Sequence, residues 1–178
     1  MTGSGKGFCA GADMEEALNI NYDDARIPDE TDWVDLIRSS KPIIAAVNGS
    51  AIGVGITMVL PFDTIIASEK SKFGMFFIKI GLVPELASSH YLVQRMGFGK
   101  ASEFCLSGRL IDAKEAFKIG LIDFLYSEED MLEEAIKKAK LIAENPGPQL
   151  RMVKELLTKN GSETDLTKAQ ERESALLR

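Results

Sequence analysis

The 178-residue sequence has little cysteine, almost no histidine and no long apolar run. Its two cysteines, Cys9 and Cys105, are too few for a disulfide framework and lie in no C-x-x-C pair, so we expect free thiols, a reducing compartment and a cytoplasmic protein. The one histidine, His90, excludes a histidine-rich metal site, and we expect no bound metal. No apolar run approaches the roughly 20 residues of a membrane-spanning helix, and the first residues lack a signal-peptide pattern.

What the sequence does contain is an ordinary globular composition with an acidic balance. Apolar residues make up 45% and charged residues 27%, and the formal net charge is -6. A chain of this length can bury roughly 70% of its unfolded surface, which is enough for a real core. Because an acidic surface repels phosphate backbones, we expect no nucleic-acid partner.

The hydrophobic pattern mixes strands and helices early in the chain and becomes mostly helical after Pro84. Continuous apolar runs predict buried strands at 41–47, 63–68 and 72–75. Helical patterns follow a period near 3.6 and end at proline or glycine. They predict helices at 32–40, 51–60, 86–96, 100–107, from 112 to a stop at Gly120, 128–144, 148–159 and 165–178. The order indicates an α/β fold with a helical tail.

Two glycine-rich stretches raise the question of anion binding. The first, Gly3-Ser4-Gly5-Lys6-Gly7, fits neither dinucleotide-binding nor P-loop spacing, and a flexible terminus explains it better. The second, Gly53-Val54-Gly55, precedes an expected helix, where free N–H groups can hold an anion or a developing oxyanion. Close packing would also require small residues there, so both interpretations stay open.

Glu85 is the most notable acidic residue, since it follows Pro84 among apolar and small residues. A carboxyl group in apolar surroundings has a raised pKa and can act as a general acid or base. Alternatively, Glu85 is a first-turn carboxylate favoured by the dipole of the helix expected from residue 86. A serine triad is not supported, because Ser50 lacks the G-x-S-x-G context and His90 is expected on a helix surface.

Taken together, the motifs resemble those of the enoyl-CoA hydratase/isomerase (crotonase) family. The resemblance covers essentially the whole chain, in order and at the expected spacings. The segments that carry it are Gly7-Phe8-Cys9-Ala10-Gly11-Ala12-Asp13-Met14, Lys41-Pro42-Ile43-Ile44-Ala45-Ala46-Val47-Asn48-Gly49, Ala51-Ile52-Gly53-Val54-Gly55, Phe62-Asp63 and Phe73-Gly74.

This resemblance implies a crotonase-like ββα spiral core over residues 1–125 and a helical trimerisation region over 126–178. It implies an acyl-CoA thioester substrate in fatty-acid metabolism, a homotrimer or dimer of trimers, and no cofactor besides the CoA of the substrate. The backbone N–H groups of Ala12 and Val54 would form the oxyanion hole. The substrate-binding residues that it implies are Phe8, Ala10, Gly11, Asp13, Met14, Gly53, Thr57 and Phe77.

The residue types at two of these positions separate the family's reactions. Hydratases of the family carry two glutamates that flank the water, and these positions correspond to Thr57 and Phe77 here. Peroxisomal-type Δ3,Δ2-enoyl-CoA isomerases instead carry the catalytic glutamate at the place of Glu85. The resemblance therefore implies an isomerase in which Glu85 moves a proton from C2 to C4 of a 3-enoyl-CoA.

Other readings of the same motifs stay open. A different crotonase reaction, such as hydration with an unusual base or thioester hydrolysis, is one alternative, and a non-catalytic acyl-CoA-binding protein is another. Family members carry strands before the point where this sequence starts and more helix after its end, so we expect a chain shortened at both ends.

Overall fold

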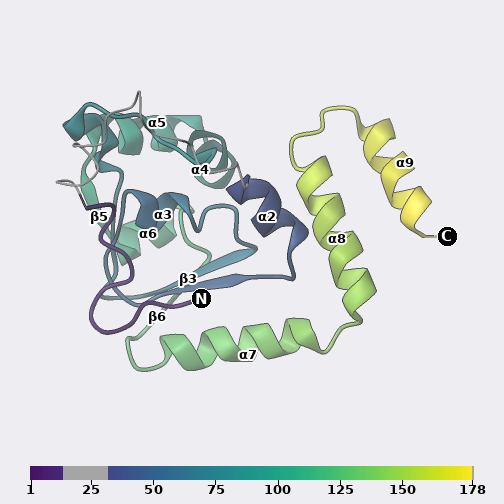
Figure 1. The fold of residues 1–178 in the computed structure, drawn as a ribbon, viewed down its shortest axis with the longest axis horizontal. Helices are drawn as coiled ribbons and strands as arrows, with labels where there is room; N and C mark the ends of the chain where they lie inside the picture. Colours follow the sequence, from purple (N-terminus) through teal and green to yellow (C-terminus); the bar gives the residue numbers. More distant parts are fainter. Residues whose placement is uncertain (14–31, 178) are drawn as a thin grey trace.

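The computed structural model describes residues 1–13 and 32–177, in which strands and short helices alternate up to β6 and helices follow (Figure 1). The strands are β1 (Ile44–Val47), β2 (Ala51–Ile52), β3 (Thr64–Ser68), β4 (Lys72–Gly74), β5 (Leu110–Asp112) and β6 (Phe124–Tyr126). The helices are α2 (Trp33–Ser39), α3 (Val54–Thr57), the 3-10 helix η1 (Phe76–Ile80), α4 (Ser88–Met96), α5 (Phe98–Ser107), α6 (Ala113–Ile119), α7 (Met131–Ala143), α8 (Gly147–Asn160) and α9 (Leu166–Leu176).

The strands form two three-stranded sheets that rise together as a spiral. One sheet has the order β1-β3-β6 and is parallel throughout; the other has the order β2-β4-β5, with β2 and β4 parallel and β4 and β5 antiparallel. From β1 to β4, consecutive strands therefore enter different sheets, whereas β5 joins β4 in the second sheet and β6 returns to the first. Equivalent strands of successive turns pair with each other, β1 with β3 and β2 with β4. This arrangement confirms the ββα spiral expected from the motifs.

The N-terminal residues take part in this spiral. Thr2 forms a parallel bridge with Ala46 of β1, and Cys9 forms one with Ala51 of β2. Between these bridges, the Asn48 side chain accepts from the Gly3 N–H at 2.9 Å and donates to the Gly5 carbonyl at 2.8 Å. The expectation of a flexible terminus is therefore wrong for the glycine-rich segment.

Alternation along the strands divides the interior between two apolar clusters. Ala45 and Val47 of β1 face the main core, whereas Ala46 of the same strand and Ile66 of β3 face α7. Helix α7 lies along the outer face of the β1-β3-β6 sheet (Figure 1) and contributes Met131 and Ala135 to that second cluster. Side chains alternate between the two faces of a strand, and here both faces of the β1-β3-β6 sheet are covered, one by the main core and the other by α7.

Two aspartates join successive turns of the spiral in the same way. Asp63 precedes β3, where its N–H donates to the carbonyl of Ile43 and its carboxylate accepts from the Ile43 N–H at 2.7 Å. Asp123 precedes β6 and makes the same two bonds with Ile65, again with 2.7 Å for the carboxylate contact. Each aspartate therefore closes the ladder at the point where a new strand begins.

The helical end of the chain extends away from the spiral, with α8 packed beside α2 and α9 beyond it (Figure 1). The side chain of Lys154 in α8 is 4% exposed and lies 2.9 Å from the Asp63 carboxylate. No helix of the described residues has the length and apolar character needed to cross a membrane.

The element boundaries correct the sequence predictions at several points. Residues 51–52 form β2 before the short α3, and strands β5 and β6 replace stretches that show no strand pattern of their own. These strands have two or three residues each, which is too short for period-two alternation to be recognised. Helix α4 begins at Ser88 instead of residue 86, because Leu86 and Ala87 are left-handed.

Candidate active site

The candidate oxyanion segment is held against β2 by backbone hydrogen bonds. The N–H groups of Phe8 and Cys9 donate to the carbonyl of Ser50, and the N–H of Ile52 donates to the carbonyl of Cys9 at 2.9 Å. The side chain of Phe8 packs against the main core. Residues 8–11 therefore follow the strand that leads into Gly53, which brings the two expected oxyanion segments side by side.

Glycine is required at two places of the second segment. Gly53 precedes α3 with φ 53° and ψ -119°, a conformation that a side chain would strain. A Cβ on Gly55 would lie 2.4 Å from the carbonyl oxygen of Cys9. The close-packing interpretation of the Gly53-Val54-Gly55 motif is therefore confirmed for Gly55. Gly53 places Val54 at the start of α3, and anion binding there stays a prediction.

The two expected oxyanion donors are available for a ligand. Within residues 1–13 and 32–177, the N–H groups of Ala12 and Val54 make no hydrogen bond. Gly11, with φ 104°, approaches the Ile52 carbonyl, since a Cβ there would lie 3.3 Å from its oxygen. Ala10, Ala12 and Asp13 are exposed. Met14, also expected to bind substrate, lies outside the described residues.

Glu85 meets Thr57 across the spiral. The Thr57 hydroxyl donates to a carboxylate oxygen of Glu85 at 3.2 Å, and Thr57 itself is fully buried in α3. The same hydroxyl lies 3.5 Å from the carbonyl of Val54, one helical turn earlier. The Glu85 carboxylate is thus hydrogen-bonded to α3, the helix whose first N–H group, that of Val54, is an expected oxyanion donor.

Two expectations about Glu85 are wrong. It is exposed in this chain, and apolar surroundings therefore do not enclose it. It also lies before the first turn of α4, which begins at Ser88, so it is not a first-turn carboxylate of that helix. The apolar residues around it in the sequence are themselves largely exposed, and Val83 has 79% of its surface accessible.

Two apolar residues that precede Glu85 in the sequence, Phe77 and Met75, lie in different parts of the structure. The ring of Phe77 lies beside Gly53, because a Cβ on Gly53 would be 3.9 Å from its Cζ atom. Met75 is buried in the main core. Phe77 therefore lies beside the expected oxyanion segment, and its role in substrate binding stays a prediction, whereas Met75 is a core residue.

The arrangement combines one carboxylate with two free N–H groups, one of them at a helix start. Backbone donors of this kind stabilise negative charge that develops on a carbonyl oxygen, and a carboxylate can move a proton to or from the adjacent carbon. The described residues hold no group of three or more His, Cys, Asp or Glu side chains that could bind a metal.

The sequence contains no sign of the turn that connects Glu85 to α4. Leu86 and Ala87 are ordinary helix formers, yet both have positive φ. Ser88 follows them, is 1% exposed and has a hydroxyl without a hydrogen-bond partner in the described residues. Glycine or asparagine at these positions would have signalled a turn, and neither is present.

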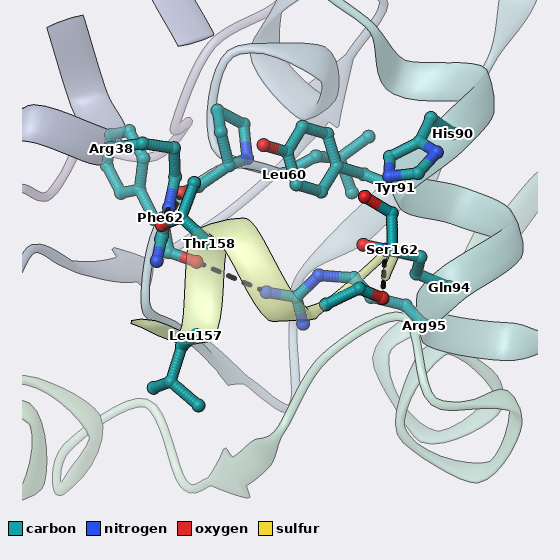
Figure 2. Close-up of a pocket in the computed structure, with 12 residues that line it drawn as sticks. Arg38, Leu60, Phe62, His90, Tyr91, Gln94, Arg95, Leu157, Thr158 and Ser162 are labelled. Atoms are coloured by element: carbon teal, nitrogen blue, oxygen red, sulfur yellow. Dashed lines mark hydrogen bonds between the residues drawn. The ribbon is translucent and has the colours of Figure 1, made fainter. Parts of the chain in front are cut away.

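A cavity of about 240 Å³ lies apart from this site, between α4, the Leu60–Phe62 turn and the end of α8 (Figure 2). Both arginines that line this cavity already donate hydrogen bonds within the protein: Arg38 to Thr158 and Asp63, and Arg95 to Asp123. Burial raises the pKa of Tyr91, and the nearby arginines oppose that shift. The cavity shares no residue with the Thr57 and Glu85 site.

Comparison with known proteins was made on the whole chain. A family model described as enoyl-CoA hydratase/isomerase matches residues 1–178. A Rhizobium meliloti protein named "Probable enoyl-CoA hydratase" is 37% identical over 90% of this chain and 63% of its own length. A Dictyostelium discoideum protein named "Probable enoyl-CoA hydratase, mitochondrial" is 41% identical over 87% of this chain and 56% of its own length. The chain thus spans less than two thirds of these relatives.

Solved structures resemble the fold closely. The enoyl-CoA hydratase of Bacillus anthracis superposes with a TM-score of 0.90 at 32% identity, over 99% of this chain and 69% of that one. A Thermobifida fusca protein crystallised in complex with CoA gives a TM-score of 0.77 at 31% identity, over 82% of this chain and 56% of that one. With the family model matched from the first residue to the last, the chain belongs to the enoyl-CoA hydratase/isomerase family.

Proposed function

We propose that the protein acts on acyl-CoA thioesters and converts 3-enoyl-CoA into 2-trans-enoyl-CoA by a 1,3 proton shift. The observation that carries the proposal is the contact of the Glu85 carboxylate with Thr57, in the helix that begins with the free N–H of Val54. The Thermobifida fusca relative that binds CoA supports the thioester substrate.

In the proposed reaction, Glu85 removes a proton from C2 of the substrate. The electron pair moves toward the thioester carbonyl, and the resulting enolate oxygen accepts hydrogen bonds from the N–H groups of Ala12 and Val54. Glu85 then delivers the proton to C4, and the double bond settles between C2 and C3. One carboxylate is sufficient because the base of the first step is the acid of the second.

Thr57 and Phe77 support isomerisation over hydration. Neither side chain carries a carboxylate that could activate water, and the Phe77 ring lies beside Gly53, where it would exclude water from the thioester. Glu85 instead supplies the carboxylate that contacts α3, through its hydrogen bond with Thr57.

Hydration of 2-enoyl-CoA is the second candidate. The relatives from Rhizobium meliloti and Dictyostelium discoideum both carry the name enoyl-CoA hydratase. An exposed carboxylate such as Glu85 can also accept a proton from water, which gives this candidate a chemical basis.

The decisive experiment compares a 3-enoyl-CoA and a 2-enoyl-CoA as substrates of the purified protein. We expect the 3-enoyl thioester to be converted and the 2-enoyl thioester to gain no hydroxyl group. Glu85→Gln should reduce turnover by about 10²–10⁴-fold with little change in acyl-CoA affinity. Glu144→Gln, which changes an exposed carboxylate at the end of α7, is the control.

Other outcomes would redirect the proposal. Formation of a 3-hydroxyacyl product at a rate that depends on Glu85 would favour hydration. Tight CoA binding without any turnover would favour a non-catalytic acyl-CoA-binding protein. Equal isomerase rates for the wild type and Glu85→Gln would remove Glu85 from the mechanism.

A further inference from the structure

The segment between Glu85 and α4 is an unusual turn. Leu86 and Ala87 have φ values of 53° and 55°, and they are the two non-glycine residues with positive φ in the described part of the chain. The N–H of Ser88 donates to the carbonyl of Glu85 at 2.9 Å, which closes a four-residue turn. Two left-handed central residues are typical of a type I′ turn, where asparagine and glycine are the usual choices.

Three consecutive residues are therefore in unfavourable states. Leu86 and Ala87 each bring a Cβ atom into the left-handed region, where L-residues are sterically penalised. Ser88 is 1% exposed, and its hydroxyl lacks a partner among the described residues. Such states persist only where the surrounding structure imposes them, and they concentrate at functional sites.

The relaxed alternative shows what the turn prevents. With Leu86 and Ala87 right-handed, α4 would begin at residue 86, as the sequence pattern predicts. Glu85 would then cap α4, and the N–H groups of the first helical turn would compete for its carboxylate. In the structure, α4 begins only at Ser88, and the Glu85 carboxylate instead accepts a hydrogen bond from the Thr57 hydroxyl at 3.2 Å.

We infer that Leu86 and Ala87 are positioning residues: their left-handed turn keeps the Glu85 carboxylate on Thr57 and away from the N-terminus of α4. The inference rests on the proposed function for its effect on turnover. It concerns the geometry of Glu85 and not the identity of the substrate, so it can be tested apart from that function.

The test compares two substitutions of the same residue. Ala87→Val places a β-branched side chain where left-handed φ is least tolerated, and we expect kcat to fall between about 10- and 100-fold while KM changes little. Ala87→Gly keeps the left-handed conformation without the steric penalty and should retain the wild-type kcat with a higher melting temperature. Ala139→Val in α7 is the control for adding a β-branched side chain at an exposed helical alanine.

A crystal structure of Ala87→Val supplies a readout that does not depend on the reaction. We expect α4 to begin earlier and the 3.2 Å contact between Glu85 and Thr57 to be lost. An unchanged contact in that variant would overturn the inference, whatever the activity of the protein. An unchanged kcat would do the same, provided that Glu85→Gln has abolished turnover. Failure of Glu85→Gln to affect turnover would instead contradict the proposed function and leave the structural readout to decide on the turn.

If Ala87→Val does not fold, Leu86→Asn with Ala87→Gly gives a second test. This pair favours the type I′ turn by local preference, so it should raise the melting temperature and preserve the contact. A structure in which that pair extends α4 to residue 86 would contradict the role of the turn.

Discussion

The hydroxyl of Thr57, which is fully buried, lies 3.2 Å from the carboxylate of Glu85, which is exposed. The two residues come from α3 and from the loop before α4, so the contact joins successive turns of the spiral. Through it, the position of the carboxylate depends on the same short helix that places the Val54 N–H. A change at Thr57 should therefore alter catalysis without removing the base.

Replacement of Thr57 tests this dependence. A hydrogen bond of this kind contributes about 0.5–1.5 kcal/mol, so Thr57→Val should lower kcat about 2- to 10-fold. Thr57→Ser keeps the hydroxyl and should stay close to the wild type. Steady-state kinetics with a 3-enoyl-CoA measure both. A loss as large as that of Glu85→Gln would show that Thr57 takes a more direct part in the chemistry than the contact alone implies.

The fold could be predicted further than the site. Apolar runs at β1 and β3 are long enough to mark strands, and Asp112 and Gly120 mark the ends of α6 correctly: the Asp112 carboxylate accepts from the Glu115 N–H, and Gly120 has φ 87°. Glu85 could be identified as a candidate because a carboxylate is rare among apolar neighbours. Its exposure and its contact with Thr57 could not be foreseen, because they depend on a left-handed turn of leucine and alanine that no local preference favours.

Gly55 offers a test of the close approach between α3 and the segment 8–11. A Cβ at this position would lie 2.4 Å from the Cys9 carbonyl oxygen, so Gly55→Ala must displace backbone. We expect lower stability and weaker turnover, because the expected oxyanion donor Val54 lies on α3 and the expected donor Ala12 directly follows the segment 8–11. Gly99→Ala in α5 meets no atom within 4 Å and should instead stabilise the protein by up to about 1 kcal/mol. Equal melting temperatures for the two variants would contradict the packing argument.

Asp63 and Asp123 make the same backbone contacts but differ in their charged partners. Asp63 lies 2.9 Å from both Arg38 and the buried Lys154, whereas Asp123 pairs with Arg95 at 3.1 Å and is more exposed. Asp63→Asn leaves the Lys154 ammonium buried without a counter-charge and should cost about 3–5 kcal/mol in unfolding free energy. For Asp123→Asn we expect about 1–3 kcal/mol.

Urea unfolding of both variants measures the difference. Adding Lys154→Met to Asp63→Asn removes the buried charge and should recover part of the lost stability. If the double variant is no more stable than Asp63→Asn, the cost arises from the lost backbone contact to Ile43 and not from the unpaired lysine.

A pH-dependent contribution comes from Arg109, which lies between Glu103 and Glu115. Its guanidinium donates to Glu103 at 2.6 Å and to Glu115 at 3.0 Å, and it lowers the pKa of both carboxyl groups. Carboxyl groups with a lowered folded pKa stabilise the protein above their unfolded pKa, and this stability is lost as the pH falls through the folded pKa. Arg109→Gln should therefore lower the melting temperature at about pH 7 and have less effect at about pH 3. A larger effect in acid would contradict this sign.

The assembly can be tested on α8, two of whose apolar side chains are exposed in the described part of the chain. Val153 is 53% exposed and Leu157 is 67% exposed, and both lie in the region 126–178 that the family resemblance implies as the trimerisation region. We expect the purified protein to sediment as a trimer or a dimer of trimers. Leu157→Glu should shift it toward monomers, because a carboxylate at a buried contact loses its hydration. Gln149→Glu adds the same charge to an exposed polar position of α8 and should leave the mass unchanged. A wild-type monomer at micromolar concentration would contradict the predicted assembly, and a Leu157→Glu variant that keeps the oligomeric mass would place the contact elsewhere on the surface.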